Sequence, residues 1–493
     1  MKEQIHFGTD GWRAIIGEDF TEETLTLAVA ASAKAFRALQ AEQADLQEKN
    51  ILLVGFDCRL NAGEYAQIAA RVLRDFGFKV HVSDTYCPTP CLCWSVAQNK
   101  NALGGLMLTS SHNPAEYLGL KLRMSDGGAS PQEFTNCVEA SLDEADLQAE
   151  ARKEWLSTFA KSYAFVPTNA EDLSIYKKDF VGPYLEALKS RVNVECIKNA
   201  QLKIALDPLY GAGRLYLAGL LEDMGVEVVE VNNQEDPSFN GLHPEPIEPW
   251  VCEGLKAVVE HKCDAGFITD GDADRIAAID SRGRYVNPHR IILLLVNHLV
   301  RTKRQRGRVV STLTASALLS RLCSELGIEL TSTPVGFKWI YAQMLKGDVL
   351  IGGEESGGIG LPYHVMERDG LLMALLMVEA MAETGRHLED LLDDIFTKIG
   401  VMEFERQGLQ INNDQMARFR EEILVDYSPE CLVDTHVREI NRADGIKIVL
   451  EDDSWLMMRP SGTEPLVRIY AEAETRDKVE ALLNCAKEVI LER

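Results

Sequence analysis

Residues 51–57, ILLVGFD, form an apolar run too short for a helix, and the polar turn CRLNAGE (58–64) follows them. A helical stretch then runs to Gly77, and FKVHVSD (78–84) has the composition of a second strand. A strand, a helix, a glycine that can adopt positive φ, and another strand form a βαβ unit. Units of this kind build mostly parallel sheets covered by helices.

The same order of elements recurs twice further along the chain. Residues 202–232 contain LKIALDP, the turn LYGAG, the helical LYLAGLLEDM, Gly225 and VEVVEVN. Residues 308–333 contain RVVSTL, the helical TASALLSRLCSEL, Gly327 and IELTST. Three copies of one supersecondary unit predict three similar α/β domains with mixed, mostly parallel sheets.

The pattern changes after Gly400. IKIVLEDDSWLMMRP (446–460) and PLVRIYAEAE (465–474) alternate like strands of a half-buried sheet, and 475–492 is typical of an amphipathic helix. These segments predict a smaller C-terminal α+β domain. Residues 143–178 are charged and helical in pattern, without a strand signal, and are expected to close the first domain. The expected domains are 1–185, 186–303, 304–400 and 401–493.

Composition and charge exclude several classes of protein. A chain of 493 residues exceeds one hydrophobic core. With 51 Lys and Arg against 76 Asp and Glu, the formal net charge of −25 disfavours binding to nucleic acids and membrane surfaces. The start lacks a secretory signal, and the most apolar runs, 291–300 and 371–381, fall short of the ~20 residues of a membrane span.

The cysteines indicate a reduced compartment. Eleven cysteines spread thinly through the chain do not form a disulfide framework, so a cytoplasmic protein is expected. CPTPCLCW (87–94) lacks the paired spacing of a metal site, and its three thiols are expected to be buried and inert.

Ligands of open α/β sheets bind beyond the carboxyl ends of the strands, so the loops there carry the functional hypotheses. TSSHNP (109–114) follows the strand end at 106–108. A serine in this loop can carry a phosphoryl group cradled by backbone N–H groups, or can simply cap a helix. An acyl hydrolase is disfavoured because the chain has no GxSxG motif.

The second loop, ITDGDADRI (268–276), places Asp270, Asp272 and Asp274 at alternate positions. In an extended loop the three carboxylates point the same way, and they repel one another unless a divalent cation lies among them. Oxygen ligands of this kind suit Mg²⁺ or Ca²⁺. The alternative is a solvated acidic turn.

Two further loops suit sugar and phosphate. GGEESGGIG (352–360) offers polar acceptors between glycines that let a ligand approach the backbone, although a plain flexible loop has the same composition. RPSGTEPLVR (459–468) combines two arginines with two hydroxyls and an accessible glycine N–H, which makes a phosphate cradle.

Together with FGTDGWR (7–13), these four loops resemble the α-D-phosphohexomutase superfamily, the phosphoglucomutase and phosphomannomutase enzymes. The motifs occur in family order and span essentially the whole chain. The resemblance implies three α/β domains and a smaller fourth domain around a central cleft, in agreement with the repeats.

The resemblance also implies roles for particular residues. Ser111 would carry the exchanged phosphoryl group, with His112, Lys121 and Arg13 as the other catalytic residues. Asp270, Asp272 and Asp274 would hold Mg²⁺ together with a phosphate oxygen on Ser111. The implied substrate-binding residues are Arg275, Gly336 and Lys338 of TPVGFKWI, Glu354, Ser356, Arg459, Ser461, Gly462, Thr463 and Arg468.

The chain departs from the family pattern at two places. Many bacterial members have the sequence SGH in the loop that corresponds to residues 352–360, whereas this chain has SGG. Either His364 or Lys338 is the candidate to replace that histidine. The serine loop has Ser110 where alanine is commoner, so the assignment to Ser111 rests on motif alignment alone.

The expected activity is interconversion of hexose 1-phosphate and hexose 6-phosphate, with glucose or mannose as the sugar. The implied cofactors are Mg²⁺ and hexose 1,6-bisphosphate, in a monomer or homodimer whose fourth domain closes as a lid hinged near Gly400. The alternatives are a phosphoglucosamine mutase, a phosphopentose mutase, a non-catalytic sugar-phosphate-binding paralogue and a Mg²⁺-dependent phosphatase. The first of these is disfavoured because the chain has Trp12 where phosphoglucosamine mutases usually have isoleucine.

Overall fold

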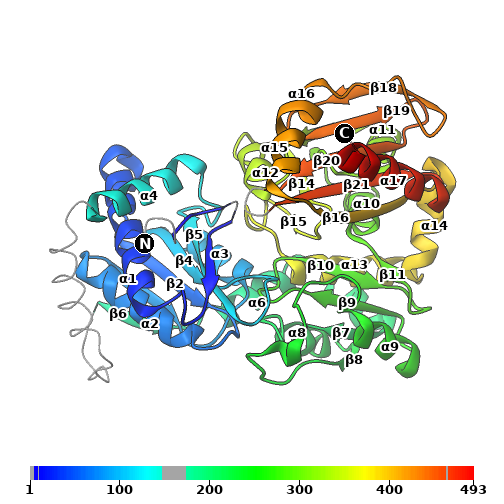
Figure 1. Ribbon diagram of the computed structural model, residues 1–493. Coiled ribbons are helices and arrows are strands. Elements are labelled where there is room, and N and C mark those ends of the chain that lie inside the picture. Colours follow the sequence, from blue (N-terminus) through cyan, green and yellow to red (C-terminus); the bar gives the residue numbers. More distant parts are fainter. Residues whose placement is uncertain (1–4, 9, 147–173, 462–464, 493) are drawn as a thin grey trace.

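Four β-sheets define the architecture of the chain (Figure 1). The computed structural model describes residues 5–8, 10–146, 174–461 and 465–492. Three α/β domains with mixed sheets are followed by a smaller C-terminal domain, which confirms the expected fold class. In Figure 1 the blue-to-cyan first domain lies on one side, and the green second domain and the orange-to-red fourth domain lie on the other.

The first sheet has the strand order β1-β5-β4-β2-β3-β6. Strand β2 pairs in parallel with β3 and β4, whereas β5 is antiparallel to β4 and β1. The turn between α2 and β3 contains Gly77 at φ +82, as the repeat predicts. The elements are β1 (Trp12–Ile15), α1 (Glu22–Glu42), β2 (Ile51–Phe56), α2 (Ala62–Asp75), β3 (Lys79–Ser83), α3 (Thr89–Gln98), β4 (Ala102–Leu108), β5 (Tyr117–Met124), α4 (Gln132–Asp146) and β6 (Ile175–Lys178).

Strand β6 corrects the expectation for the segment 143–178, whose pattern predicts no strand. Its four residues pair in parallel with β3, with Ile175 opposite Val80. Only Ile175 is partly buried and the other three residues are exposed, so the strand is held by backbone hydrogen bonds at a sheet edge and leaves no apolar signature. Residues 147–173, also expected to be helical, lie outside the described residues.

The second sheet has the order β11-β10-β9-β7-β8. Strands β7, β8 and β9 are parallel, and β10 turns back antiparallel to β9, so residues 270–275 form the connection between two buried strands. The elements are α6 (Val181–Lys189), α7 (Val194–Ala200), β7 (Lys203–Asp207), α8 (Tyr216–Asp223), β8 (Glu227–Glu230), α9 (Cys252–His261), β9 (Ala265–Thr269), β10 (Ile276–Ile279) and β11 (Tyr285–Val286).

The third sheet has the order β13-β12-β14-β15, with only the short β15 antiparallel. Its elements are α10 (Pro288–Asn297), β12 (Arg308–Thr312), α11 (Ala317–Leu326), β13 (Leu330–Thr333), α12 (Phe337–Met344), β14 (Val349–Gly353), β15 (Ile359–Gly360), α13 (Gly370–Thr384) and α14 (Leu388–Ile399).

Helix α13 joins the cores of the second and third domains. Its residues 370–381 are all buried, and it packs on α6, α7, β9 and β10 as well as on α10. A helix enclosed on every side needs no polar face, which explains the apolar run at 371–381. Among the described residues, no helix combines the length and apolar composition required to cross a membrane.

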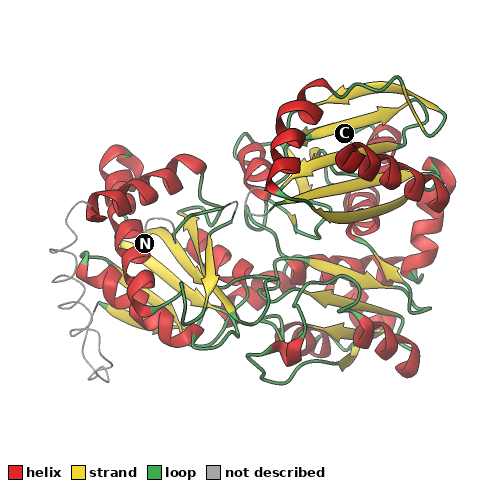
Figure 2. Cartoon of the chain, viewed as in Figure 1, coloured by secondary structure: helices red, strands yellow, loops and turns green. Residues whose placement is uncertain are grey.

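The fourth sheet has the order β16-β21-β20-β19-β18-β17, and all its pairings are antiparallel. It has its own hydrophobic core, and α17 packs against β21 and β16 (Figure 2). The elements are β16 (Glu403–Gln410), α15 (Asn413–Arg418), α16 (Leu424–Asp426), β17 (Cys431–Leu432), β18 (Thr435–Asn441), β19 (Ile446–Leu450), β20 (Trp455–Pro460), β21 (Leu466–Ala473) and α17 (Arg476–Glu492).

Three cysteines before and within α3 are buried. Cys87, Cys91 and Cys93 have no exposed surface, and burial raises the pKa values of Cys91 and Cys93. Their expected burial is confirmed.

Candidate active site

The serine loop begins where β4 ends and leads back into the antiparallel β5. Ser111 lies in the left-handed region at φ +53, and its backbone N–H donates to Thr109 Oγ1 at 2.9 Å. The Ser111 hydroxyl donates to Asp270 Oδ2 of the second domain at 2.9 Å and is almost completely buried. The hydroxyl of the neighbouring Ser110 is also buried and has no hydrogen-bond partner among the described residues. Of these two serines, Ser111 is therefore the one whose hydroxyl is bonded to an aspartate.

Arg59, in the turn after β2, fixes the shape of the serine loop. Its guanidinium donates to four backbone oxygens of this loop: Ser111 at 2.7 Å, Asn113 at 2.7 Å, Pro114 at 2.7 Å and Tyr117 at 2.9 Å. The side chain has no exposed surface and forms an ion pair with Asp57 at 3.2 Å. The sequence analysis missed Arg59. The available signal was its position after a strand of the same sheet, where ligand-binding loops gather.

The loop between β9 and β10 gathers three carboxylates. Oxygen atoms of Asp270, Asp272 and Asp274 lie within 4.8 Å of one another, and all three side chains are fully buried. Burial and the charges of Asp274 and Asp272 hold the pKa of Asp270 well above its usual range. Asp272 Oδ1 and Asp274 Oδ1 are buried without a hydrogen-bond partner among the described residues. Crowded carboxylates with unpartnered oxygens fit a divalent cation such as Mg²⁺.

Lys121, on β5, lies beside these aspartates. Its Nζ is 2.8 Å from Asp272 Oδ2, 3.0 Å from Asp274 Oδ2 and 3.0 Å from Asp10 Oδ2. Burial acts to lower the pKa of Lys121, but the three carboxylates raise it above the usual value, so the ammonium remains charged. Burial likewise acts to raise the pKa of Asp272, but Lys121 holds it below the usual range.

Two contacts from other domains complete this cluster, and the sequence analysis predicted neither. Thr89, at the start of α3, donates its hydroxyl to Asp272 Oδ2 at 2.5 Å and its backbone N–H to the Asp272 carbonyl at 2.9 Å. Arg368 of the third domain reaches Asp10 at 2.5 Å and Asp274 at 2.7 Å. Three domains therefore meet at one charged cluster, which no local sequence pattern reveals.

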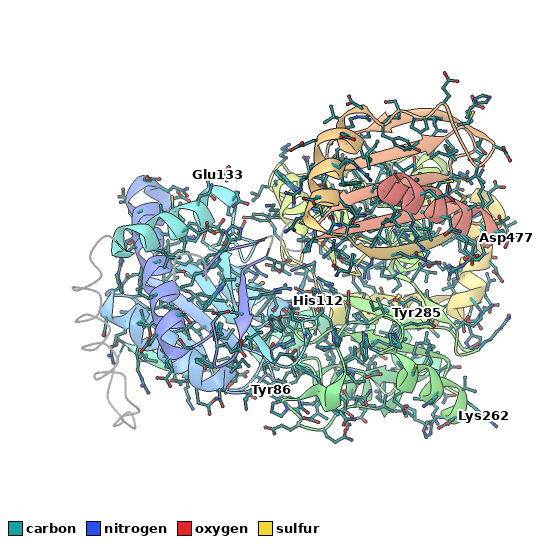
Figure 3. All side chains as sticks on the ribbon, in the orientation of Figure 1. Tyr86, His112, Glu133, Lys262, Tyr285 and Asp477 are labelled. Carbon is teal, nitrogen blue, oxygen red and sulfur yellow. The ribbon has the colours of Figure 1, made fainter. Side chains whose placement is uncertain are left out.

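Three basic residues contact Ser111, its loop or its hydrogen-bond partner Asp270. His112 Nδ1 is 3.4 Å from Ser111 Oγ, and Figure 3 shows this side chain where the first domain meets the second. Burial, assisted by the charges of Arg275, Arg13 and Lys121, holds the pKa of His112 well below its usual value, so its imidazole is neutral. Arg13 donates to Asn113 Oδ1 at 2.6 Å, and the backbone N–H of Arg275 donates to Asp270 Oδ1 at 3.0 Å.

The GEESGG loop lies directly against the exit of the aspartate loop. The N–H of Ile276 donates to the carbonyl of Gly357 at 3.1 Å. Gly357 has φ +94, and a Cβ there would lie 2.5 Å from the Ile276 carbonyl oxygen, so only glycine fits. Glu354 is buried, which raises its pKa to about 7 even though Arg368 acts to lower it. Ser356 is partly exposed.

Two other predicted residues of the third domain lie at the start of α12. Gly336 has φ +126 and precedes the helix, and Lys338 Nζ donates across to Gln132 Oε1 of the first domain at 3.0 Å. His364, the other candidate to replace the missing histidine, is fully buried with Nε2 3.2 Å from Asp369 Oδ2. The structure therefore assigns His364 to the packing around α13 and leaves Lys338 at the domain boundary.

Residues 459–468, the loop predicted to bind phosphate and called the phosphate loop below, run from the end of β20 to the start of β21 in the fourth domain. Arg459 and Arg468 lie opposite each other on these strands, and the Ser461 N–H donates to the Leu466 carbonyl at 2.7 Å. Arg459 is partly buried and Arg468 is exposed. Gly462 and Thr463, predicted in the same loop, lie outside the described residues.

Comparison with known proteins gives the class of protein that this arrangement defines. Four consecutive domain models of the phosphoglucomutase/phosphomannomutase family match the chain: alpha/beta/alpha domain I at 4–149, domain II at 182–283, domain III at 287–399 and the C-terminal domain at 413–487.

Individual relatives agree over almost the full length. A phosphoglucomutase/phosphomannomutase of Thermococcus kodakarensis is 31% identical over 97% of this chain and 96% of its own. A phosphoglucosamine mutase of Caldicellulosiruptor bescii is 29% identical, with 96% of each chain covered. A crystal structure from Thermus thermophilus, provisionally assigned as a phosphomannomutase, superposes with a TM-score of 0.82 at 31% identity and covers 99% of this chain and 100% of that one.

The chain belongs to the phosphoglucomutase/phosphomannomutase family, within the α-D-phosphohexomutase superfamily. The resemblance inferred from the sequence motifs is confirmed. The protein is a phosphosugar mutase of this family, and sugar phosphates are the substrates that the family implies.

Proposed function

We propose that the protein interconverts hexose 1-phosphate and hexose 6-phosphate, with glucose and mannose as the sugars, through a phosphoserine at Ser111. The observation that carries this proposal is the buried Ser111 hydroxyl bonded to Asp270, beside two further carboxylates and the Lys121 ammonium. A serine held in this way is suited to carry a phosphoryl group, since phosphoryl transfer depends mostly on positioning and charge neutralisation.

The residues around Ser111 would divide this task among them. Asp270, Asp272 and Asp274 would hold Mg²⁺ with an oxygen of the serine phosphate, and the ion would neutralise negative charge on the phosphoryl group. Lys121 and Arg13 add fixed positive charge nearby. Neutral His112, 3.4 Å from Ser111 Oγ, can accept the serine proton when Ser111 takes a phosphoryl group.

In the forward direction the bond between the phosphorus and Ser111 Oγ breaks and a bond to O6 of hexose 1-phosphate forms. The O6 proton passes to a base, Ser111 Oγ takes up a proton, and the product is hexose 1,6-bisphosphate. The sugar then turns end for end. The bond between phosphorus and O1 breaks as a bond to Ser111 Oγ forms, the serine proton passes to His112, O1 takes up a proton, and hexose 6-phosphate leaves. The bisphosphate is therefore also the activator that phosphorylates an empty Ser111.

A sugar that binds in two orientations requires an anchor separate from the reacting end. Arg459, Arg468 and the loop between them, with Ser461, Gly462 and Thr463, would hold the non-reacting phosphate. Glu354 and Ser356 would bind sugar hydroxyls, with Gly336, Lys338 and Arg275 orienting the ring. Closure of the fourth domain near Gly400 would keep water from the phosphoserine.

The choice of sugar follows from which hydroxyls are bound. The GEESGG loop resembles readers of the 3- and 4-hydroxyls, which glucose and mannose share. A site that does not bond a hydroxyl discriminates weakly, so we expect activity on both epimers, with roughly 10- to 200-fold preference at most and glucose favoured. Galactose 1-phosphate, inverted at C4, should be rejected far more strongly.

A second candidate is phosphoglucosamine mutase activity. It is supported by the relative from Caldicellulosiruptor bescii, which is named a phosphoglucosamine mutase and aligns over 96% of each chain. Glucosamine differs from glucose only at C2, where none of the recognised motifs supplies a dedicated partner.

A coupled assay over the 1-phosphates of glucose, mannose, glucosamine, N-acetylglucosamine, galactose and ribose tests both candidates. Each reaction contains Mg²⁺ and a trace of the matching bisphosphate, and released inorganic phosphate is measured in parallel. The proposal predicts the highest kcat/KM with glucose or mannose and no net phosphate release. Preference for an amino sugar or ribose would reassign the substrate. Net phosphate release would indicate a phosphatase, and no turnover of any sugar would favour a binding paralogue.

A further inference from the structure

The carboxylate of one residue, Asp444, contacts both the phosphate loop of the fourth domain and the third domain. Asp444 lies in the turn between β18 and β19, and each of its oxygens has a different partner. Oδ1 accepts from Arg459 Nε at 2.8 Å, and Oδ2 accepts from the backbone N–H of Val335 at 2.8 Å. Val335 immediately precedes Gly336, at the start of the segment that carries Lys338.

We infer that Asp444 is a positioning residue that orients Arg459 for the non-reacting phosphate and couples this contact to the loop that orients the sugar. This inference rests on the proposed function, because it assigns Arg459 to phosphate and residues 336–338 to the sugar. Asp444 itself does not need to touch the substrate.

The electrostatics of the sheet explain why Arg459 requires such a partner. Arg459 and Arg468 are direct cross-strand neighbours, an arrangement in which like charges repel. Asp444 places one carboxylate against Arg459, and a bound phosphate would add a second anionic partner. The hydrogen bond from Arg459 Nε to Asp444 fixes the plane of the guanidinium. Bidentate recognition of a phosphate requires such a fixed plane.

The burial and the turn geometry hold Asp444 in place. The side chains of Asp444 and Arg459 are only 20% and 19% exposed, so the ion pair is partly shielded from water. Gly445, the next residue, has φ +89, and a Cβ there would lie 2.5 Å from the Met458 carbonyl oxygen. The turn therefore packs closely on the backbone beside Arg459.

Other contacts between the two domains involve different residues and offer a matched control. Arg321 of α11 donates to Asp453 Oδ2 at 2.8 Å, and Asp453 also pairs with Arg438. Asp453 lies in the turn between β19 and β20, and its ion pair joins the same two domains. Asp453→Asn therefore weakens the interface without changing the partners of Arg459 or Val335.

The test compares Asp444→Asn with Asp453→Asn in the full-length protein. Asparagine keeps one oxygen for the Val335 N–H but turns its amide hydrogens toward Arg459, so it removes only the arginine contact. The expected result for Asp444→Asn is a rise of about 10-fold in KM for glucose 1-phosphate, with kcat within about twofold of wild type. Asp444→Ala loses both contacts and should raise KM further, whereas Asp453→Asn should leave KM unchanged.

A second readout does not depend on turnover. Glucose 6-phosphate should raise the melting temperature of the wild type and of Asp453→Asn, and at the same concentration should raise that of Asp444→Asn by clearly less. Unchanged KM and an unchanged shift in Asp444→Asn would overturn the inference. So would equal losses of kcat and melting temperature in the Asp444 and Asp453 variants, which would mark Asp444 as an ordinary interface residue.

The two levels of inference can fail separately. If wild-type protein turns over none of the hexose phosphates, the proposed function fails, and the thermal shifts with glucose 6-phosphate alone decide whether Asp444 acts on phosphate binding. If the wild type is active and Asp444→Asn behaves like wild type in both measurements, the mutase assignment stands and only the role of Asp444 is wrong.

Discussion

The two ends of the candidate site differ in how deeply their charged groups are buried and in how many carboxylates those groups contact. At the serine end, Ser111 and Lys121 are 1% exposed and the three aspartates are fully buried. Lys121 and Arg368 there each touch carboxylates of both the first and the second domain. At the phosphate-loop end, Arg468 is exposed and Arg459 is only partly buried, with one carboxylate in contact.

This contrast matches the two tasks that the proposed reaction requires. A phosphoryl group can be transferred only if donor, acceptor and neutralising charges are fixed before the substrate arrives, and buried charges that satisfy one another provide that rigidity. An anchor that must receive and release either phosphate of the sugar requires contact with water. Changes at the buried end should therefore cost much more than changes at the exposed end.

The largest effect is expected for Ser111→Ala. Removing the hydroxyl that donates to Asp270 should eliminate the phosphoryl group from the serine peptide and lower kcat by roughly three orders of magnitude or more. Intact-protein and peptide mass spectrometry, together with the coupled assay, measure both. Ser110→Ala is the control and should keep most activity. Phosphate found on Ser110 instead would show that the assignment of the nucleophile is wrong.

The next largest effect concerns Arg59, which supports the serine loop without facing the aspartates. Lysine cannot reproduce a planar fork that serves four carbonyl oxygens, so Arg59→Lys should lower the local opening free energy of residues 110–117 by about 2–3 kcal/mol. Native-state amide hydrogen exchange measures this quantity. Arg37→Lys, which alters another arginine bonded to a backbone carbonyl of the first domain, should leave that loop unchanged. Equal exchange in both variants would remove the proposed support.

The metal hypothesis predicts a smaller effect. Asp272→Asn removes one of three charges that offset a dication, so Mg²⁺ affinity measured by calorimetry should fall by about 10- to 100-fold, with the rate falling in parallel. The triple variant should be little worse, because the three residues act as a unit. Asp280→Asn, a buried aspartate of the same domain paired with Arg284, is the control. Full activity in excess chelator would contradict a metal site here.

The smallest effect is a pH dependence from Glu354. If the ionised carboxylate binds sugar hydroxyls, kcat/KM should rise about 10-fold between pH 6 and pH 8, because its pKa is raised to about 7. The free energy of unfolding should change with pH in the opposite direction to kcat/KM. The folded pKa lies above the unfolded value of about 4.3, so the free energy of unfolding falls as pH rises from about 4.3 to 7. Glu354→Gln should flatten both profiles, measured by kinetics and thermal melting, and a profile identical to wild type would exclude this role.

Sequence patterns captured the elements whose signals are local. The strands and helices of the three βαβ units were predictable because the first strand of each unit is mostly buried and each helix is followed by a glycine with positive φ. The edge strand β6 was missed because exposed residues at a sheet edge carry no apolar pattern. The serine and aspartate loops were found because they follow buried strands.

The sequence by itself determined the repeated α/β units, the distinct C-terminal domain, and the motifs that place this chain in its family. Only the tertiary structure decided which groups meet. The aspartate cluster receives contacts from other domains through Thr89, Arg368 and Asp10. Arg59 donates hydrogen bonds to the backbone of the serine loop. Asp444 contacts two loops that are more than 100 residues apart in the sequence. The reason is physical: a periodic pattern reports whether a residue faces a core, whereas an ion pair across domains depends on the packing of whole sheets.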